Sequence, residues 1–446
     1  MDGRLLGLSV VVGVAAGAGA LVFMWALETC TRLLLVDLGG YTPASTLGEG
    51  DGSPASSFAR PWAIPLVVGL GGLVAGLLVF GFAPEAEGHG TDAAIHAIHH
   101  DPTGIRPRVV VVKLVASAIT IGSGGSGGRE GPTAQISAGT ASAVARLTRL
   151  PYPTARVLVT AGMAAGIAAI FRAPLGGAML GVELLYLEDL EADALLPGFV
   201  ASVVAYVVYG AVDGFVPVFG DQGAIGFTGA SQFVWFAVLG VAAGLVGRLY
   251  SSTFYGVTAA CRRIALPRWL LPGIAGVLVG LLGLVVPGVL GTGYGTAQEL
   301  MTPQGVLGLP LLVLVAIPFA KIVATSLSIG SGGSGGIFGP GMVIGASLGA
   351  AFWALLHEVP ALHGSVGDSP AIFALVGMVA VFGSIAHAPI AMTLMVAEMT
   401  GNLAVVPPAM LALAIASVIV GRATIYRSQL EHRSDRPDVA MTATVT

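Results

Sequence analysis

The stretch IGSGGSGGREGP, residues 121–132, has almost no side chains, and the chain repeats it as IGSGGSGGIFGP at residues 329–340. Eight residues match without a gap, Arg129-Glu130 is replaced by Ile337-Phe338, and Gly-Pro then returns. The pair raises the question of what a nearly bare loop does twice, once with a charge pair and once with an apolar pair.

Composition predicts a helical membrane protein. Of the 446 residues, 55% are hydrophobic and only 10% are charged, whereas soluble domains carry about 25% charged residues. The mean hydropathy is +0.88. About 20 apolar residues suffice for one crossing of a bilayer. Uncharged stretches of that length lie at Leu5–Leu27, Pro61–Phe82, Ala194–Val212 and Trp269–Leu290. We therefore expect an all-α polytopic protein surrounded by a lipid bilayer.

The distribution of basic residues predicts the orientation, because Lys and Arg accumulate in cytoplasmic loops. The segment Asp37–Arg60 is rich in Gly, Ser, Thr and Pro and is expected outside. The groups Arg106, Arg108 and Lys113, residues 262–268 and the basic tail are expected inside. Both termini then lie in the cytoplasm, and the plasma (inner) membrane is the expected location.

Charge and cysteine content exclude other classes. The net charge of −4 gives no sign of nucleic acid as a partner. Cys30 and Cys261 are far apart and form no disulfide framework. The first apolar stretch is longer than the core of a signal peptide, so it is interpreted as a membrane helix.

The glycine loops belong to a longer internal repeat. Four matches in the same order indicate a duplication of roughly 210 residues. They are Gly88 with Gly293 (205 residues apart), Lys113 with Lys321 (208), the glycine loops themselves (208), and one segment in which Pro174 pairs with Pro389 and Glu183 with Glu398 (both 215). Repeats of transporters are often inverted, with the site between them near the midplane. We expect one half at residues 1–222, the other at 223–422, and a short cytoplasmic tail at 423–446.

The glycine loops are interpreted as anion-binding helix starts. A loop that feeds a helix exposes unpaired N–H groups at the positive end of the helix dipole, and these bind anions without a full charge. Partial charges bind an anion and release it, which suits transport. A Walker loop needs Gly-Lys-Ser or Gly-Lys-Thr, which neither copy has. Another alternative is that the glycines only allow helices to pack closely, but this does not explain Arg129-Glu130.

Glu130 is the candidate gate. A carboxylate in an apolar membrane domain costs at least about 2.5–3.5 kcal/mol. Beside an anion site it can occupy that site as a tethered anion, and protonation then lets it swing away. It is therefore also a candidate proton carrier. The alternative is a simple ion pair with Arg129, although adjacent residues on a helix do not face each other.

These motifs resemble a known family. GGREGP (Gly127–Pro132) and GGIFGP (Gly335–Pro340) look like the two signature anion-binding motifs of the CLC chloride channels and chloride/proton antiporters. The resemblance continues in PEAEGHGTD (Pro84–Asp92), FRAPLGG (Phe171–Gly177) and IYRSQL (Ile425–Leu430), and so spans essentially the whole chain. It implies a CLC-type fold of about 18 tilted and partly broken helices in two inverted repeats, and a homodimer with one pore per subunit. No CBS domain is expected.

The resemblance assigns roles residue by residue. Glu130 is similar to the gating glutamate. The backbone of Ile337 and Phe338 is similar to the amides that hold the central anion. Tyr426 is similar to the tyrosine whose hydroxyl closes that site, the alternative being an interfacial anchor. The anion-binding residues expected in this chain are Gly88, His89, Gly90, Gly128, Arg129, Gly131, Gly336, Ile337, Phe338 and Tyr426.

Two positions depart from the family pattern. His89 stands where the first family motif has a serine that contacts the central anion. It can either donate an N–H to the anion or turn to the cytoplasmic mouth. Leu184 stands where coupled members have an internal glutamate, with Glu183 one place before it. Leucine carries no proton, and Glu183, as one of the repeated glutamates, is expected to have a structural role inside its half.

Three histidines, His96, His99 and His100, have a spacing that can bind a metal. Without cysteine or a firm carboxylate beside them, a polar cytoplasmic helix face is the preferred interpretation, and no metal site is predicted. An intramembrane hydrolase would need a motif such as His-Glu-x-x-His. HEVPALH, which begins at His357, places its histidines six residues apart, so an enzyme is not predicted.

The sequence therefore predicts transmembrane anion transport with chloride as the default substrate and no cofactor. Protonation of Glu130 gates it, and chloride/proton exchange is one mechanism. A passive channel without proton coupling is the alternative that Leu184 favours. A preference for another anion, such as fluoride or nitrate, is the alternative that His89 favours.

Overall fold

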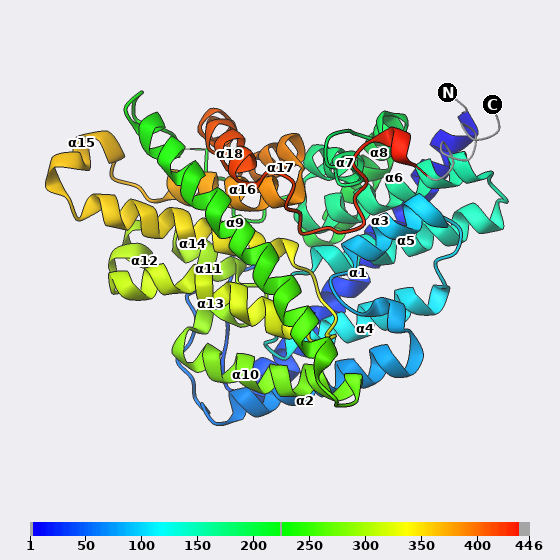
Figure 1. Cartoon of the computed structure of the whole chain (residues 1–446), viewed down its shortest axis with the longest axis horizontal. Coiled ribbons are helices and arrows are strands. Elements are labelled where there is room, and N and C mark those ends of the chain that lie inside the picture. The colour runs from blue at the N-terminus through cyan, green and yellow to red at the C-terminus, as the bar shows by residue number, and fades with distance from the viewer. Residues whose placement is uncertain (1–2, 224, 437–446) are drawn as a thin grey trace.

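The structure is a computed structural model that describes residues 3–223 and 225–436. Its described part has 18 α-helices, eight short 3₁₀- or π-helical segments and, in place of strands, only isolated β-bridges (Figure 1). The helices before residue 223 are α1 (Gly3–Thr31), α2 (Ala63–Phe82), α3 (Thr91–His100), α4 (Pro107–Gly122), α5 (Glu130–Leu147), α6 (Tyr152–Phe171), α7 (Pro174–Glu183) and α8 (Leu195–Asp213). Those after it are α9 (Gln232–Arg263), α10 (Leu271–Val285), α11 (Tyr294–Glu299), α12 (Pro303–Leu307), α13 (Leu311–Gly330), α14 (Phe338–His357), α15 (His363–Val366), α16 (Ala371–Ala386), α17 (Pro389–Thr400) and α18 (Val406–Val420). The prediction of an all-helical fold is confirmed.

Within the described residues, nine helices are long and apolar enough to cross a membrane. The four uncharged stretches of the sequence fall on α1, α2, α8 and α10. Large apolar side chains lie exposed along these helices, for example Val285 at 77%. Lipid, rather than water, is the solvent in which such a surface is stable.

The repeat is visible in the backbone. Helices α4 and α13 each end where a glycine loop begins, and α5 and α14 begin where those loops end. Gly124 and Gly332, 208 residues apart, have φ of 105° and 106°, a conformation that glycine adopts without strain. The same sequence therefore bends the chain in the same way at both places.

The matched glutamates join the two halves reciprocally. Glu183 accepts hydrogen bonds from the N–H groups of Ile390 and Ala391 at the start of α17, at 3.3 and 2.7 Å. Glu398 accepts those of Leu175 and Gly176 at the start of α7, at 3.1 and 2.7 Å. Each carboxylate thus caps a helix of the opposite half. The structural role is confirmed, but the expectation that it lies inside each half is wrong.

For one of the four sequence matches, the structure pairs different residues from those that the sequence pairs. Gly88 and Gly90 have φ of 76° and 83°, and α3 begins directly after them. Gly291 and Gly293 have φ of 60° and 83°, and α11 begins directly after them. The structural counterpart of Gly88 is therefore Gly291, not Gly293, because the backbone turn and not the shared letters defines the equivalence.

The buried lysines also repeat, and one of them corrects an expectation. The Lys113 ammonium donates to the carbonyls of Ala86 and Gly88 at 3.1 and 2.6 Å. That of Lys321 donates to Val289 and Gly291, both at 3.0 Å. Lys113 is fully buried, so it does not belong to a cytoplasmic basic loop. It adds a donor to buried carbonyls of a tight turn, which also accept from the Ser334 hydroxyl and the Gly335 N–H.

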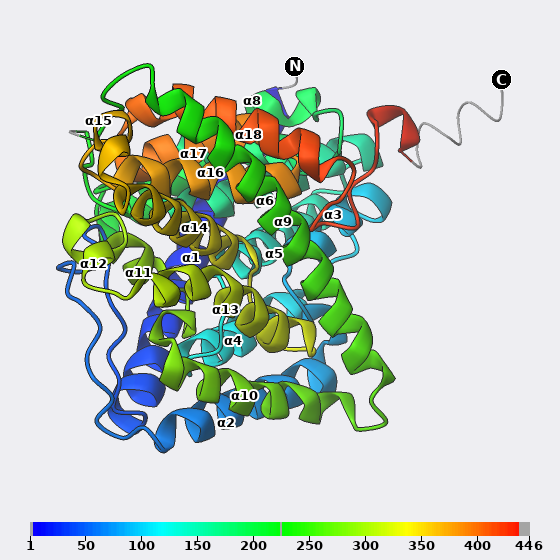
Figure 2. The same cartoon turned by 60° about the vertical axis from the view of Figure 1, so that its left-hand side comes forward.

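Different helices form the two ends of the molecule. Figures 1 and 2 show α2 and α10 side by side at one end of the molecule, with α16, α17 and α18 toward the other. Gly72 of α2 lies so close to α10 that a Cβ atom would come 2.2 Å from the Pro272 oxygen. Leu5 and Arg436 line one cavity, so the start of α1 and the end of the described tail lie on the same face. Residues 437–446 of the predicted tail lie outside the described residues.

Candidate anion pathway

Three glycine-rich loops meet at the centre of the protein. Gly128 and Gly336 exchange backbone hydrogen bonds of 2.7 and 2.6 Å, which pairs the two copies of the motif. The Gly88 N–H donates to the Gly333 oxygen at 2.9 Å. A Cβ atom on Gly131 would lie 2.0 Å from the His89 oxygen, so glycine is required for this approach. Loops 200 residues apart in the sequence therefore bring their exposed amides into one place.

The starts of α5 and α14 leave amide hydrogens free for an anion. The first intrahelical bonds run from Thr133 to the Arg129 oxygen and from Gly341 to the Ile337 oxygen, both at 3.1 Å. The N–H groups before these residues have no partner in their own helices, and Pro132 and Pro340 have no N–H to satisfy. Two helix starts thus present backbone donors to the centre.

Glu130 already occupies one of these sites. The Gly339 N–H donates to its Oε2 at 3.1 Å, and the hydroxyl of Tyr294 donates to its Oε1. The carboxylate is buried and lies at the start of α14, where an anion would bind. This is the geometry expected of a tethered anion that closes the site.

Arg129 does not serve mainly as the partner of Glu130. Its Nε is 3.8 Å from the Glu130 carboxylate, whereas its Nη1 donates to Glu49 Oε2 at 2.8 Å and its Nη2 pairs with the other oxygen. The strap, defined as residues 39–62 between α1 and α2, carries Glu49. The Arg172 guanidinium holds the strap through the Gly48 oxygen at 2.7 Å. Among the described residues, Arg129 is the cation that interacts with the Glu130 carboxylate, and Glu49 of the strap largely neutralises it.

Sequence reasoning missed Glu49 and Tyr294. Tyr294 lies in the repeated GYGT motif. Aligning this motif with GHGT by sequence pairs Tyr294 with His89, whereas the backbone turns show that its counterpart is Thr91. Glu49 lies in an irregular segment far from either glycine loop, and nothing in its neighbourhood points to Arg129.

On the other side of Glu130, His89 and Tyr426 face each other. Their ring centroids are 5.5 Å apart. His89 Nδ1 and the Tyr426 hydroxyl are buried and have no hydrogen bond of normal geometry within the described chain, although the Thr91 hydroxyl is close enough to interact with Tyr426. Unpaired buried donors are costly, so their convergence is typical of a ligand site. The Ile337 and Phe338 amides lie at the adjacent start of α14.

The tail fixes Tyr426. The Ile425 N–H donates to the Ile385 oxygen at 3.0 Å, and the Leu430 N–H donates to the Leu185 oxygen at 3.1 Å. Tyr426 is fully buried, which excludes the alternative of an interfacial anchor. The tail therefore contributes a residue to the candidate site.

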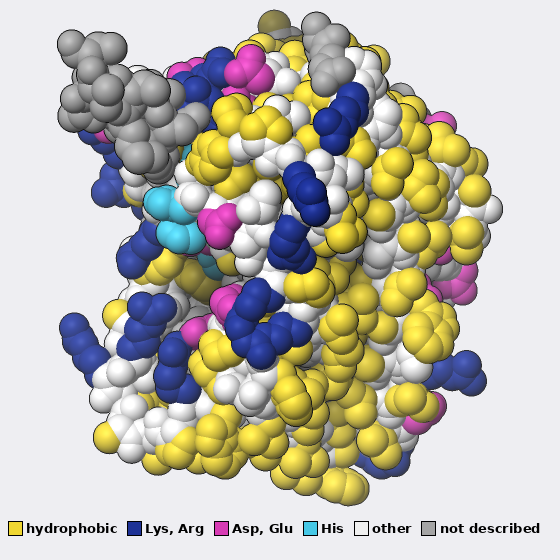
Figure 3. Space-filling model, turned by 90° about the vertical axis from the view of Figure 1, so that its right-hand side faces the viewer, with side chains coloured by type: hydrophobic (Ala, Val, Ile, Leu, Met, Phe, Trp, Pro, Cys, Tyr) yellow, Lys and Arg dark blue, Asp and Glu magenta, His cyan; other side chains and the backbone are white. Residues whose placement is uncertain are grey.

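Two cavities lead to this centre. One, of about 520 Å³, is lined by His89, Asp92, His96, His100 and Arg262 among others. Figure 3 shows histidine, basic and acidic side chains around a hollow on a face that is otherwise largely apolar.

The other cavity, of about 320 Å³, is lined by Glu49, Arg129, Thr292 and Tyr294 among others. Gly88–Gly90 thus lines the first cavity and its counterpart Gly291–Gly293 lines the second. The two mouths of the pathway are related by the repeat.

The expectation of one polar histidine face is only partly met. His96 and His100 stack with ring centroids 4.2 Å apart and line the larger cavity. His99 is buried, with Nε2 3.0 Å from the Leu185 oxygen. It lies outside the nine candidate spans, and burial lowers the pKa of His99 to about 4. A neutral ring that donates to Leu185 is a structural element, not part of a polar face.

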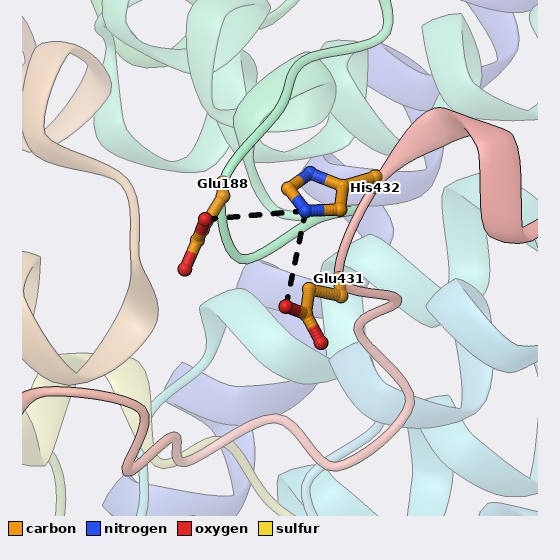
Figure 4. A group of neighbouring side chains, drawn as sticks. All are labelled: Glu188, Glu431 and His432. Carbon is orange, nitrogen blue, oxygen red and sulfur yellow. Dashed lines mark ion pairs between the residues drawn. The ribbon is translucent and has the colours of Figure 1, made fainter.

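The described chain brings three candidate metal ligands together in one place, formed by Glu188, Glu431 and His432 (Figure 4). His432 Nε2 is 4.0 Å from Glu188 and 3.8 Å from Glu431. Arg422 lies 2.5 Å from Glu431 and 3.9 Å from Glu188. Since Arg422 already supplies a positive charge, this group is an exposed ion-pair cluster that fastens the tail.

A model of the voltage-gated chloride channel family matches residues 71–421. The ClcB-like chloride channel protein of Ralstonia nicotianae is 31% identical over 95% of this chain and 97% of its own. The voltage-gated ClC-type chloride channel ClcB of Escherichia coli is 33% identical over 85% of this chain and 90% of its own. This chain belongs to the voltage-gated chloride channel family.

Solved structures show the same fold. A slow cyanobacterial Cl⁻/H⁺ antiporter has a TM-score of 0.79 at 23% identity, over 96% of this chain and 97% of its own. A CLC-type fluoride/proton antiporter has a TM-score of 0.78 at 22% identity, over 96% and 98%. The chain is thus an integral membrane protein of the CLC fold, with the apolar helices that such a protein needs.

Proposed function

We propose that this protein transports chloride across the plasma (inner) membrane, and that protonation of Glu130 opens the pathway. The observation that carries the proposal is the Glu130 carboxylate on the Gly339 amide at the start of α14. A carboxylate and a chloride ion compete for the same donor there. A protonated carboxyl binds amide donors less strongly, so the anion displaces it.

The central site is the second part of the proposal. The His89 Nδ1, the Tyr426 hydroxyl and the Ile337 and Phe338 amides receive the anion between the two mouths. These donors carry no full charge when His89 is neutral, so they bind the anion weakly enough for it to leave again. Transport requires no cofactor.

The assembly follows the family. We propose a homodimer of two separate pores, two inverted halves at residues 1–222 and 223–422, and both termini in the cytoplasm. The shared face of Leu5 and Arg436 supports a common side for both ends of the described chain.

Proton-coupled exchange is tested with purified protein in liposomes, with chloride and proton fluxes recorded together. In the wild type, a chloride gradient is expected to drive protons against their own gradient. In Glu130→Gln the side chain cannot carry a proton, so chloride flux is expected to persist while proton flux falls to the leak of empty liposomes. A wild type that moves chloride but no protons eliminates exchange and leaves the channel.

The channel is the second candidate, and Leu184 favours it. Leu184 is fully buried, and Glu183 beside it is engaged at the start of α17. Neither residue is placed as a free proton carrier at the expected inner position. If the channel is correct, Glu130→Gln raises chloride flux and leaves proton flux at the leak level in both proteins.

Another anion is the third candidate, and His89 favours it. A fluoride/proton antiporter shares the fold, and the unpaired Nδ1 of His89 beside Tyr426 is a donor of a different shape from a serine hydroxyl. Replacement by serine and a comparison of chloride, fluoride and nitrate fluxes test this. Unchanged selectivity would count against a direct role of His89.

A further inference from the structure

Among the described residues of the second half, Tyr294 is the one side-chain donor to the Glu130 carboxylate. Its hydroxyl donates to Oε1, and the Gly339 N–H donates to Oε2 at 3.1 Å. Each oxygen of the carboxylate thus has its own donor. Hydrogen bonds to a charged group are about twice as strong as those between neutral groups.

The position of the phenol is fixed independently of Glu130. Tyr294 is 2% exposed, and its ring packs edge-on against Phe219 with centroids 5.9 Å apart. The Arg129 guanidinium lies 5.1 Å from the centroid of the ring. A donor held in this way does not follow the carboxylate when the latter moves, so it favours one position of Glu130.

The turn before Tyr294 is equally fixed. Gly293 has φ of 83°, and a Cβ atom there would lie 2.9 Å from Lys321 Nζ. On the following residue, Gly295, a Cβ atom would lie 2.0 Å from the Ala44 oxygen of the strap. Lys321 and the strap therefore both pack closely against the start of α11.

Few other charged or titratable groups face the carboxylate. On the elements packed against it they are Arg129, which Glu49 neutralises, and the buried phenols of Tyr250 and Tyr426, which interact with it only at longer range. Tyr250 uses its hydroxyl on the Ile337 oxygen at 2.9 Å. Tyr294 is therefore the titratable side chain that stabilises the Glu130 carboxylate at the start of α14 relative to a position away from it.

We propose that Tyr294 is the latch of the gate: its hydroxyl holds ionised Glu130 on the start of α14 and is released when the carboxyl group is protonated. The latch acts through Glu130 and is a positioning residue, and the proposal rests on Glu130 being the gate. The repeat places Thr91 at the same position beside Tyr426, so the latch is the outer member of a pair of hydroxyl groups that follow the Gly-x-Gly turns.

The test is Tyr294→Phe, which removes only the hydroxyl, in proteoliposomes with chloride flux recorded from pH 4 to 9. The expected result is a chloride flux about tenfold higher at pH 7, since a hydrogen bond to a charged group has been lost. The pH of half-maximal flux is expected to rise by about one unit, because the charged form of Glu130 has lost a donor and protonates more easily. The matched control is Tyr186→Phe, which removes another buried phenol hydroxyl, one that donates to Glu191 and not to Glu130.

The double variant with Glu130→Gln decides whether the effect acts through the gate. Adding Tyr294→Phe to Glu130→Gln is expected to leave chloride flux unchanged, because no carboxylate remains to be held. An equal effect of Tyr294→Phe in both backgrounds, or a wild-type pH profile in the single variant, overturns the latch. Tyr294→Met, a flexible apolar replacement, gives the same readout if the Phe variant fails to fold. If Glu130→Gln itself behaves as wild type, the proposed gate fails, and this outcome is distinct from failure of the latch alone.

Discussion

The two glycine loops have one backbone and two functions. Both bend at a glycine with φ near 105°, and both lead into a helix whose first amides have no partner within the helix. In one copy the next residues are Arg129 and Glu130, and in the other they are Ile337 and Phe338. The first copy supplies the side chain that occupies the site, and the second supplies the site that it occupies. A duplicated scaffold thus becomes asymmetric at two residues.

The scaffold around the loops stays symmetric. Lys113 and Lys321 bond equivalent pairs of carbonyls, and Glu183 and Glu398 cap equivalent helices. Ser126 of one loop bonds Thr325 of the other half at 2.9 Å. The repeated backbone therefore determines where the amide groups lie. The two residues that differ between the copies determine whether a loop contributes a carboxylate or only amide donors.

The largest expected effect comes from breaking the contact between the loops. In Gly131→Ala the new Cβ would lie 2.0 Å from the His89 oxygen and 3.1 Å from Gly336 Cα. Both neighbours are backbone, so neither can move cheaply, and we expect a loss of about 3 kcal/mol or more. Thermal unfolding in detergent measures it. Gly81→Ala, with open space around its Cβ, is the control and is expected to be neutral or slightly stabilising.

A smaller effect tests whether the two copies are supported equally. Lys113→Met and Lys321→Met each remove two hydrogen bonds from a charged donor to buried carbonyls, although Ala86 keeps the Ser334 hydroxyl and Gly88 and Gly291 each keep a backbone N–H. Each is expected to cost about 2 kcal/mol of unfolding free energy. The two losses should agree within experimental error, measured as the temperature of half-unfolding. A large loss for one lysine alone would show that the scaffold is not symmetric in energy.

The smallest effect separates structure from proton coupling. Glu183→Leu and Glu398→Leu each remove a helix cap and are expected to cost about 1 kcal/mol. The ratio of proton to chloride flux should stay that of the wild type in both. A ratio that changes for Glu183 but not for Glu398 would give Glu183 a transport role that its position in the repeat does not predict.

Much of the site was predictable from particular residues. The bare loops, the charge of Glu130 and the order of the motifs predict a candidate gate and a candidate central site, and the structure brings their residues together. Tyr294 was not predicted because the sequence match pairs it with the wrong residue of the first half. Glu49 was not predicted because it lies in the irregular strap, where no motif relates it to Arg129. Lys113 was misassigned because a basic residue near a loop resembles a cytoplasmic charge until its carbonyl partners are known.

The sequence by itself determined that the chain is a membrane protein with an internal repeat and two glycine-rich helix starts, because composition and repeated residues are properties of the chain alone. Only the tertiary structure decided which donors hold Glu130, which acid neutralises Arg129, and that Glu183 and Glu398 exchange partners between halves. These contacts join residues from opposite halves or from the strap, and their geometry exists only after the halves have packed together.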